Sequence, residues 1–163
     1  MAGRLQALSR SHDVLTAEAW ASAALADIVQ GALEPVREQY GERITAEGPE
    51  LRLKPRIATM LSLGMHELAS NARRYGSLSN GTGNVRIRWR IEGDRRRFEW
   101  RERGGPPVRE PATGGYGMRI VERVLAAEFG GSARIDFEPD GIVFRLDAPT
   151  GDLGREATAW SMV

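Results

Sequence analysis

Two polar side chains, Glu67 and Asn71, lie four residues apart in the segment MHELASNARRYGSLS. On an α-helix this spacing places them nearly above one another on one face. A carboxylate beside a carboxamide suits a hydrated cation, because Mg²⁺ prefers oxygen ligands and is usually held by one or two side chains plus substrate phosphates. The pair therefore predicts a magnesium site, and the alternative is an ordinary solvated helix face. Apolar residues on a neighbouring stripe would seat the helix on a core: Ile57, Leu61, Leu68 and Ala72.

Other metal and nucleotide chemistries lack the residues they need. A zinc-protease helix of the form H-E-x-x-H would require a second histidine where Ser70 stands. The chain has two histidines and no cysteine, so we expect no nitrogen- or sulfur-rich metal site. The sequence contains no G-x-x-x-x-G-K-[ST] motif, so a nucleotide would bind without a P-loop.

The composition is that of one globular domain. The chain has 163 residues, of which 41% are hydrophobic and 28% are charged. The 23 basic and 22 acidic side chains leave a net charge of +1, which gives no reason to expect a nucleic-acid partner. No apolar run has the length of a membrane span, and the first residues carry no signal-peptide pattern. We therefore expect a cytoplasmic domain without membrane contact.

Apolar periodicity predicts four helices. The helix that carries Glu67 and Asn71 should begin at Pro55, which suits a first helical turn, and end near Tyr75. The helix before it should end near Pro35, because proline cannot donate the backbone hydrogen bond that continues a helix. The expected helices cover about residues 4–15, 25–35, 55–75 and 118–129.

The clearest strand signal runs from Val85 to Ile91, where apolar residues alternate with arginines. A turn at residues 92–94 leads into a second strand that contains Phe98 and Trp100, so the two strands form a hairpin with one apolar face. We interpret the arginine face as a solvated, charge-paired surface rather than a polyanion site, because the net charge is balanced. Shorter strands are expected at residues 43–46 and 51–53, and a last hairpin should turn at residues 139–141.

These elements predict an α/β fold, a two-layer sandwich with helices on one face of a mixed, largely antiparallel sheet. The Gly/Pro-rich segment 104–117 is longer than a usual connection, which predicts a functional loop or lid. The last residues, 150–163, are expected to form a flexible tail.

Two further segments have the residue types that bind nucleotides. Glu102 ends the second strand of the hairpin and is followed by Gly104 and Gly105, so a carboxylate acceptor lies beside backbone that a flat base can approach. The glycine cluster 114–117 precedes a helix whose first backbone N–H groups could hold phosphate. This cluster does not match the G-x-G-x-x-G dinucleotide motif, because its last glycine would fall at Ile120.

The three segments in this order resemble the GHKL ATP-binding superfamily, which includes histidine kinases and DNA gyrase. Their residue patterns are most similar to those of the HWE histidine kinases. The segments HELASNARRYGSLS, WRERGGPPV and GGYGMRIVERVLAAEFGG look like that family's N, D and glycine boxes. The family is named for a histidine in the first box and a Trp-x-Glu in the second, which here are His66, Trp100 and Glu102. The resemblance covers roughly residues 4–149 and implies the Bergerat ATP-binding fold.

The resemblance also implies cofactors and site residues. ATP and Mg²⁺ are the expected cofactors, with Asn71 as metal ligand and Glu67 assisting at the metal or orienting the attacking group. Glu102 stands where the superfamily has an adenine-reading Asp, so it would accept a hydrogen bond from the adenine amine. His66 would brace the helix. The remaining residues expected at the nucleotide are Arg74 (where the family usually has Lys), Tyr75, Gly104, Gly115, Gly117 and Arg119.

One family motif is missing from the chain. The phosphoacceptor of the family sits in a His-Arg-x-Lys-Asn motif, which the sequence lacks, and His12 does not align with it. The resemblance therefore implies residues 1–15 as the remnant of a dimerisation helix, residues 16–149 as the catalytic ATP-binding domain, and a γ-phosphoryl acceptor histidine outside the chain. The expected partners are a dimerisation domain with that histidine and a response regulator. A regulatory nucleotide-binding module without phosphotransfer and a serine kinase of the anti-sigma-factor type remain alternatives.

Overall fold

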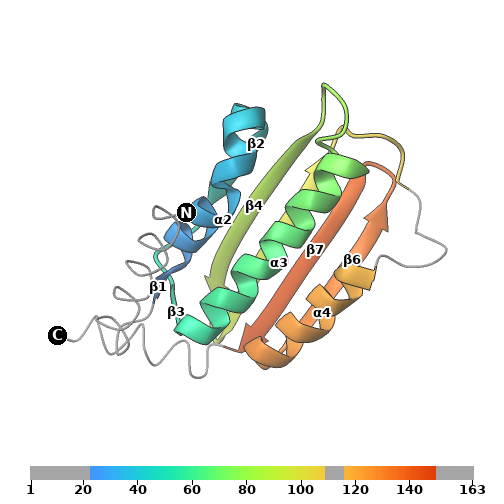
Figure 1. Ribbon diagram of the computed structural model, residues 1–163. Helices are drawn as coiled ribbons and strands as arrows, with labels where there is room; N and C mark the ends of the chain where they lie inside the picture. Colours follow the sequence, from blue (N-terminus) through green and yellow to red (C-terminus); the bar gives the residue numbers. More distant parts are fainter. Residues whose placement is uncertain (1–22, 109–115, 150–163) are drawn as a thin grey trace, which may run out of the picture.

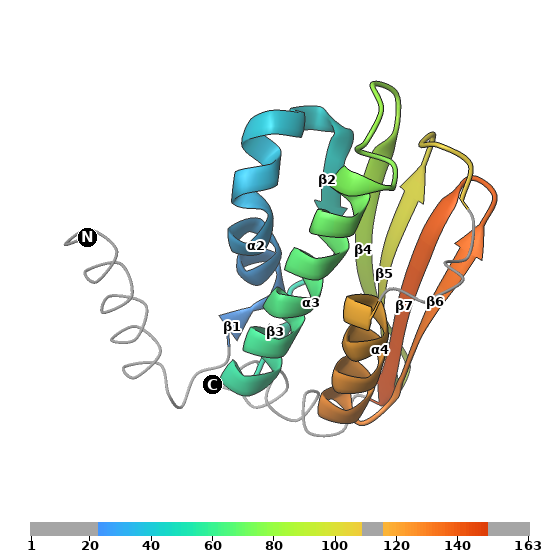
Figure 2. The ribbon, with the colours of Figure 1, turned by 45° about the vertical axis from the view of Figure 1, so that its right-hand side comes forward.

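The computed structural model describes residues 23–108 and 116–149. Within these ranges three helices lie on one face of a five-stranded sheet, as Figures 1 and 2 show. The elements in chain order are β1 (Ala23–Ala24), α2 (Leu25–Tyr40), a 3₁₀ turn η1 (Gly41–Arg43), β2 (Ile44–Glu47), β3 (Arg52–Leu53), α3 (Pro55–Arg74), β4 (Asn84–Glu92), β5 (Arg95–Arg103), α4 (Tyr116–Phe129), β6 (Ser132–Glu138) and β7 (Gly141–Pro149). The predicted α/β sandwich is confirmed.

The strand order in the main sheet is β2-β4-β5-β7-β6. Only the pairing of β2 with β4 is parallel among the described strands, and the other three pairings are antiparallel. The two hairpins, β4–β5 and β6–β7, turn where the sequence predicted. The short strands β1 and β3 form a separate antiparallel pair, so the two short predicted strands, β2 and β3, do not pair with each other.

Helix α3 crosses the middle of the helical layer and packs against both of its neighbours (Figure 1). It begins at Pro55, in the first turn, as predicted. The whole predicted apolar stripe is buried: Ile57, Leu61, Leu68 and Ala72. Glu67 and Asn71 leave the helix beside this stripe, so Glu67 is exposed and Asn71 is half-buried.

Helix α2 corrects the prediction of a stop near Pro35, because it continues to Tyr40. Proline removes one backbone hydrogen bond and its ring crowds the carbonyl of Gly31. The turn beyond it is retained because Val36 is buried and Tyr40 packs against the core, so tertiary contacts outweigh the local penalty.

Helix α4 begins at Tyr116, two residues before the predicted start at Met118. Gly117 therefore lies in the first turn of the helix and not in the loop. Residues 109–115, most of the predicted lid after Val108, fall outside the described part of the chain, as do the predicted helix 4–15 and the tail 150–163. Within the described residues no helix has the length and apolar character needed to cross a membrane.

Candidate functional site

The exposed face of α3 holds the residues predicted to bind a cation. Glu67 is exposed and Asn71 is half-buried, and His66 is exposed beside them. Because both oxygen-bearing side chains leave the same helix next to the buried stripe, a hydrated ion could reach them without disturbing the core. Within residues 23–108 and 116–149 there is no group of three or more His, Cys, Asp or Glu side chains that could hold a metal ion. This donor set fits Mg²⁺, which needs few protein ligands when phosphates and water supply the rest.

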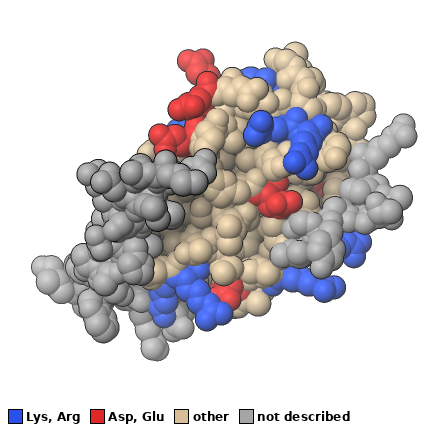
Figure 3. Space-filling view, viewed as in Figure 1, with Lys and Arg blue, Asp and Glu red and all other residues tan. Residues whose placement is uncertain are grey.

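The C-terminal end of α3 presents the predicted Arg74 and Tyr75 to solvent. Tyr75 is 73% exposed, and Arg74 lies with Arg73 in the basic last turn of the helix. Basic side chains gather over this end of α3 in the space-filling view (Figure 3). The exposed cations make this end suited to an anionic group.

Glu102 is placed differently from the other predicted residues, because its side chain is buried at 1% exposure. It extends the inward-facing series of β5 that contains Phe98 and Trp100. One carboxylate oxygen, Oε1, accepts hydrogen bonds from the backbone N–H of Ser77 (3.0 Å) and from its Oγ hydroxyl (3.2 Å). The other, Oε2, accepts a hydrogen bond from Nε1 of Trp100 (3.1 Å).

Burial sets the protonation behaviour of this carboxyl. Loss of hydration raises the pKa of Glu102 above the usual glutamate range, and the hydrogen bonds from Ser77 and Trp100 oppose that rise only in part. The two residues that lower the pKa are neutral donors, so the carboxylate is stabilised by hydrogen bonds rather than by a paired cation. A buried acid with a shifted pKa at the end of a strand is the kind of group that functional sites use.

The loop from Gly76 to Gly83, which follows α3, brings Ser77 to Glu102. A Cβ on Gly76 would collide with Oε1 of Glu102, so only glycine allows this approach. The loop is also tied to Gly104 just beyond β5: the Gly104 carbonyl accepts hydrogen bonds from Nδ2 of Asn80 (3.1 Å) and Oγ1 of Thr82 (3.0 Å). Gly104 has φ of +73°, which glycine adopts without strain. The structure thus joins the first and second predicted boxes through direct contacts.

Arg43 fastens the same loop from the other side. Its Nε donates to the carbonyl of Gly83 (2.7 Å), and its Nη2 donates to the carbonyls of Asn80 (2.6 Å) and Ser77 (3.1 Å). The guanidinium also lies over the ring of Tyr40, 5.4 Å from its centroid. The parallel pairing of β2 with β4 explains this meeting, because it puts the residue before β2 next to the residues before β4.

The third predicted box is only partly described. Gly115 lies outside the described residues, Gly117 is in the first turn of α4, and Arg119 is exposed on that helix. The described part of this box, helix α4, packs against α3, which carries the first box.

Two residues of this region were missed from the sequence. Ser77 directly follows the Tyr75-Gly76 pair of the first segment. Its position just after the end of that helix could have identified it as a site residue. Arg43 had no comparable signal, since it lies 34 residues or more before the three carbonyls it binds.

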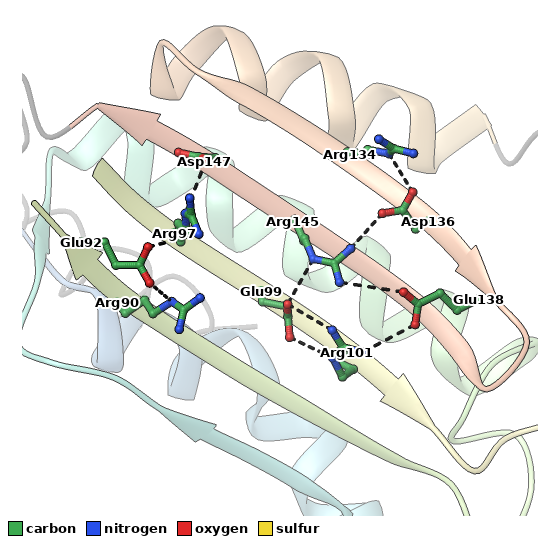
Figure 4. Close-up of polar contacts among 10 residues, drawn as sticks. All are labelled: Arg90, Glu92, Arg97, Glu99, Arg101, Arg134, Asp136, Glu138, Arg145 and Asp147. Carbon is green, nitrogen blue, oxygen red and sulfur yellow. Dashed lines mark hydrogen bonds and ion pairs between the residues drawn. The ribbon is translucent and has the colours of Figure 1, made fainter. Parts of the chain in front are cut away.

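The arginines on the outer face of the sheet form the charge-paired surface that was predicted. Figure 4 shows these side chains with the helices behind the sheet. Glu99 accepts from Arg101 (2.9 Å) and Arg145 (3.3 Å), and Arg145 also pairs with Asp136 (2.9 Å). A cavity of about 440 Å³ on this face is lined largely by arginines, among them Arg86, Arg88, Arg90, Arg97, Arg101, Arg103 and Arg145.

Comparison with known proteins agrees with the predicted fold and with the predicted resemblance to histidine kinases. Residues 1–50 match the HWE histidine kinase family. A blue-light-activated histidine kinase of Brucella anthropi is 41% identical over 155 residues, which cover 92% of this chain and 32% of that protein. The chain thus spans about a third of the length of this relative.

Solved structures share the architecture at low sequence identity. The histidine kinase domain of the Erythrobacter litoralis EL346 blue-light-activated histidine kinase superposes with a TM-score of 0.63 at 19% identity, over 82% of this chain and 62% of that one. The catalytic domain of histidine kinase ThkA gives 0.58 at 18% identity, over 77% and 91% of the two chains. ThkA in complex with response regulator protein TrrA gives 0.59 at 16% identity, over 89% and 48%.

These likenesses define the fold as that of histidine kinase catalytic domains. At the level of sequence, the chain is similar to the HWE histidine kinases over residues 1–50 and to a blue-light-activated histidine kinase over most of its length.

Proposed function

We propose that this chain is the ATP-binding catalytic domain of a two-component sensor histidine kinase and transfers the γ-phosphoryl group of ATP to a histidine outside the chain. The observation that supports this most directly is the joining of two boxes at one end of α3. Glu67 and Asn71 offer oxygen ligands on the exposed face of the helix, while the loop that follows the helix contacts Glu102. The two possible metal ligands thus lie on α3, and the buried hydrogen-bond acceptor on β5 contacts the loop that follows α3.

Each residue has a defined part in this proposal. The side-chain oxygen of Asn71 would hold Mg²⁺, and Glu67 would assist there or orient the attacking group. When bound, the ion neutralises phosphate charge, and phosphoryl transfer depends mainly on such neutralisation and on positioning. Glu102 would accept the adenine amine. The remaining expected contacts to the nucleotide come from Arg74, Tyr75, Gly104, Gly115, Gly117 and Arg119.

The proposed partners follow from the same assignment. An acceptor histidine must be brought in line with the γ-phosphate by another domain, since the family's acceptor motif is missing from this sequence. ThkA is seen with response regulator protein TrrA, which supports a response regulator as the protein that receives the phosphoryl group. The ion pairing of the outer sheet face supports the absence of a nucleic-acid partner. We further propose that the domain works in the cytoplasm, where ATP is available.

Calorimetric titration with ATP, with and without Mg²⁺, tests the metal assignment. Asn71→Ala should lose at least about tenfold of the Mg²⁺-dependent affinity, because a directly bound oxygen is removed. Thr59→Ala is a matched control on the same helix, since Thr59 is exposed three turns away and its hydroxyl bonds only the carbonyl of Pro55. Equal Mg²⁺-dependent affinity in wild type and Asn71→Ala would remove Asn71 from the metal site.

Labelled ATP tests the phosphotransfer assignment. The chain alone should gain no acid-labile label, and adding a dimerisation segment with the His-Arg-x-Lys-Asn motif should give label on that segment. Label at His12 of the chain alone would contradict the proposal, and ATP binding without any transfer would favour a regulatory module.

A further inference from the structure

Ser77 is the closest polar neighbour of the carboxylate that we propose as the base reader. It donates twice to Oε1 of Glu102, once from the backbone and once from the hydroxyl. Both residues are buried at 1% exposure, and Trp100, which donates to Oε2, is fully buried. Charge-assisted hydrogen bonds in such a dry environment fix the acceptor strongly.

The position of Ser77 is itself fixed by close backbone packing. A Cβ on Gly105 would come within 2.5 Å of the Cα of Ser77, and one on Gly83 would collide with its carbonyl oxygen. That same carbonyl accepts a hydrogen bond from Arg43. Because this packing holds the backbone of Ser77 in place, a small shift of the loop could not bring another donor to Glu102 if the Ser77 hydroxyl were removed.

The donor count leaves the carboxylate one free acceptor position. Two carboxylate oxygens offer about four lone-pair sites, and the three observed donors occupy two on Oε1 and one on Oε2. The hydrogen bonds that the structure gives this carboxylate all run from donors to it, so the remaining site on Oε2 is available to accept from a further group. An exocyclic amine, as on adenine, matches that site, whereas the carbonyl at the same position of guanine does not.

From this geometry we propose that Ser77 is a specificity-determining positioning residue, which aims Glu102 and keeps it an acceptor for the base. The inference rests on the proposed nucleotide-binding function and adds to it the residue that sets the choice of base. Trp100 supports the same carboxylate through its other oxygen.

Loss of the Ser77 hydroxyl should change the base preference through protonation. Burial already raises the pKa of Glu102, and the Ser77 hydrogen bonds counteract the rise. The described groups in contact with the carboxyl are not titratable: Ser77 from the loop and Trp100 from β5, while the backbone of Gly141 on β7 packs against the Glu102 main chain. Without the hydroxyl the pKa of Glu102 rises further, so a larger share of the carboxyl is protonated at a given pH, and a protonated carboxyl donates to a carbonyl instead of accepting from an amine.

Titration calorimetry of the full chain with ATP and with GTP, both with Mg²⁺, at pH 6 and pH 8, tests the inference. Wild type should prefer ATP, and Ser77→Ala should reduce the ratio of ATP to GTP affinity about tenfold, the loss of one hydrogen bond to a charged group. The reduction should be larger at pH 6 than at pH 8. Trp100→Phe, which removes the donor to Oε2, should shift the ratio in the same direction.

Ser79→Ala is the matched control, because Ser79 lies in the same loop and its hydroxyl bonds the carbonyl of Gly76 and not Glu102. Its affinity ratio should equal that of wild type. An unchanged ratio in Ser77→Ala at both pH values, with ATP still bound by wild type, would overturn the inference and leave Ser77 a structural residue. Failure of wild type to bind ATP at all would instead overturn the proposed function.

Discussion

Replacing Arg43 should destabilise the whole domain and loosen the loop that carries Ser77. The side chain donates three hydrogen bonds to the carbonyls of Gly83, Ser77 and Asn80. Each hydrogen bond contributes about 1 kcal/mol, and the contact with the ring of Tyr40 adds about 0.5 kcal/mol. Arg43→Ala should therefore lower the free energy of unfolding by about 3.5 kcal/mol, which for a domain of this size lowers Tm by about 7–14 °C.

Urea denaturation and calorimetric melting measure this loss, and amide hydrogen exchange locates it. Exchange should accelerate in residues 76–83 of Arg43→Ala more than in β6 or β7. Arg43→Lys should recover little, because a single ammonium cannot reach three carbonyls as the planar guanidinium does. Arg73→Ala removes the same charge from an exposed site on α3 and should cost less than about 1 kcal/mol. A loss below 1 kcal/mol in Arg43→Ala, with unchanged exchange in the loop, would refute the reasoning.

Three further substitutions give distinct outcomes. Because burial raises the pKa of Glu102, its contribution to stability is complete below about pH 4.3, the ordinary glutamate pKa, and is lost as pH rises through its folded pKa. The stability of wild type relative to Glu102→Gln should thus fall as pH increases in denaturation measured from pH 4 to 8, and a pH-independent difference would contradict the assigned burial. Pro35→Ala should raise the free energy of unfolding by about 2 kcal/mol, since the exposed Pro35 lies inside α2 and removes a backbone hydrogen bond there, and restoring that bond outweighs the entropy that the unfolded chain regains without proline; a lower Tm would show that the proline ring itself is required. Glu99→Gln should cost about 1 kcal/mol or less at low salt and nothing measurable in 1 M NaCl, because its partners Arg101 and Arg145 lie on a solvated face; a loss that persists in high salt would disprove this.

The regular elements followed from local patterns. The apolar stripe of α3 and the alternation in β4 and β5 depend on spacings of four and two residues, which tertiary packing did not override. The same alternation implies that Glu102 is buried, because a residue two positions after the inward-facing Trp100 on a strand faces the same side. The sequence predicted Glu102 as a hydrogen-bond acceptor at a strand end, but it did not identify the two residues that donate to it, Ser77 and Trp100.

Other features could not be read locally. The continuation of α2 past Pro35 depends on the core packing of Val36 and Tyr40, which no helix propensity records. The contacts of Arg43 depend on the parallel pairing of β2 with β4, and this pairing became visible only in the folded chain.

That parallel pairing also decides when the loop after α3 can become ordered. A hairpin such as β4–β5 forms within about 1–10 μs, because its strands are neighbours in the chain. Strands β2 and β4, by contrast, are separated in the chain by β3 and α3. The Arg43 hydrogen bond to Gly83 spans 40 residues, so loop-closure entropy must be overcome before this bond forms. The Ser77 loop therefore gains its final shape only with a long-range step of folding, and partly folded chains without that step would lack an organised loop at the end of α3 even when every hairpin is present.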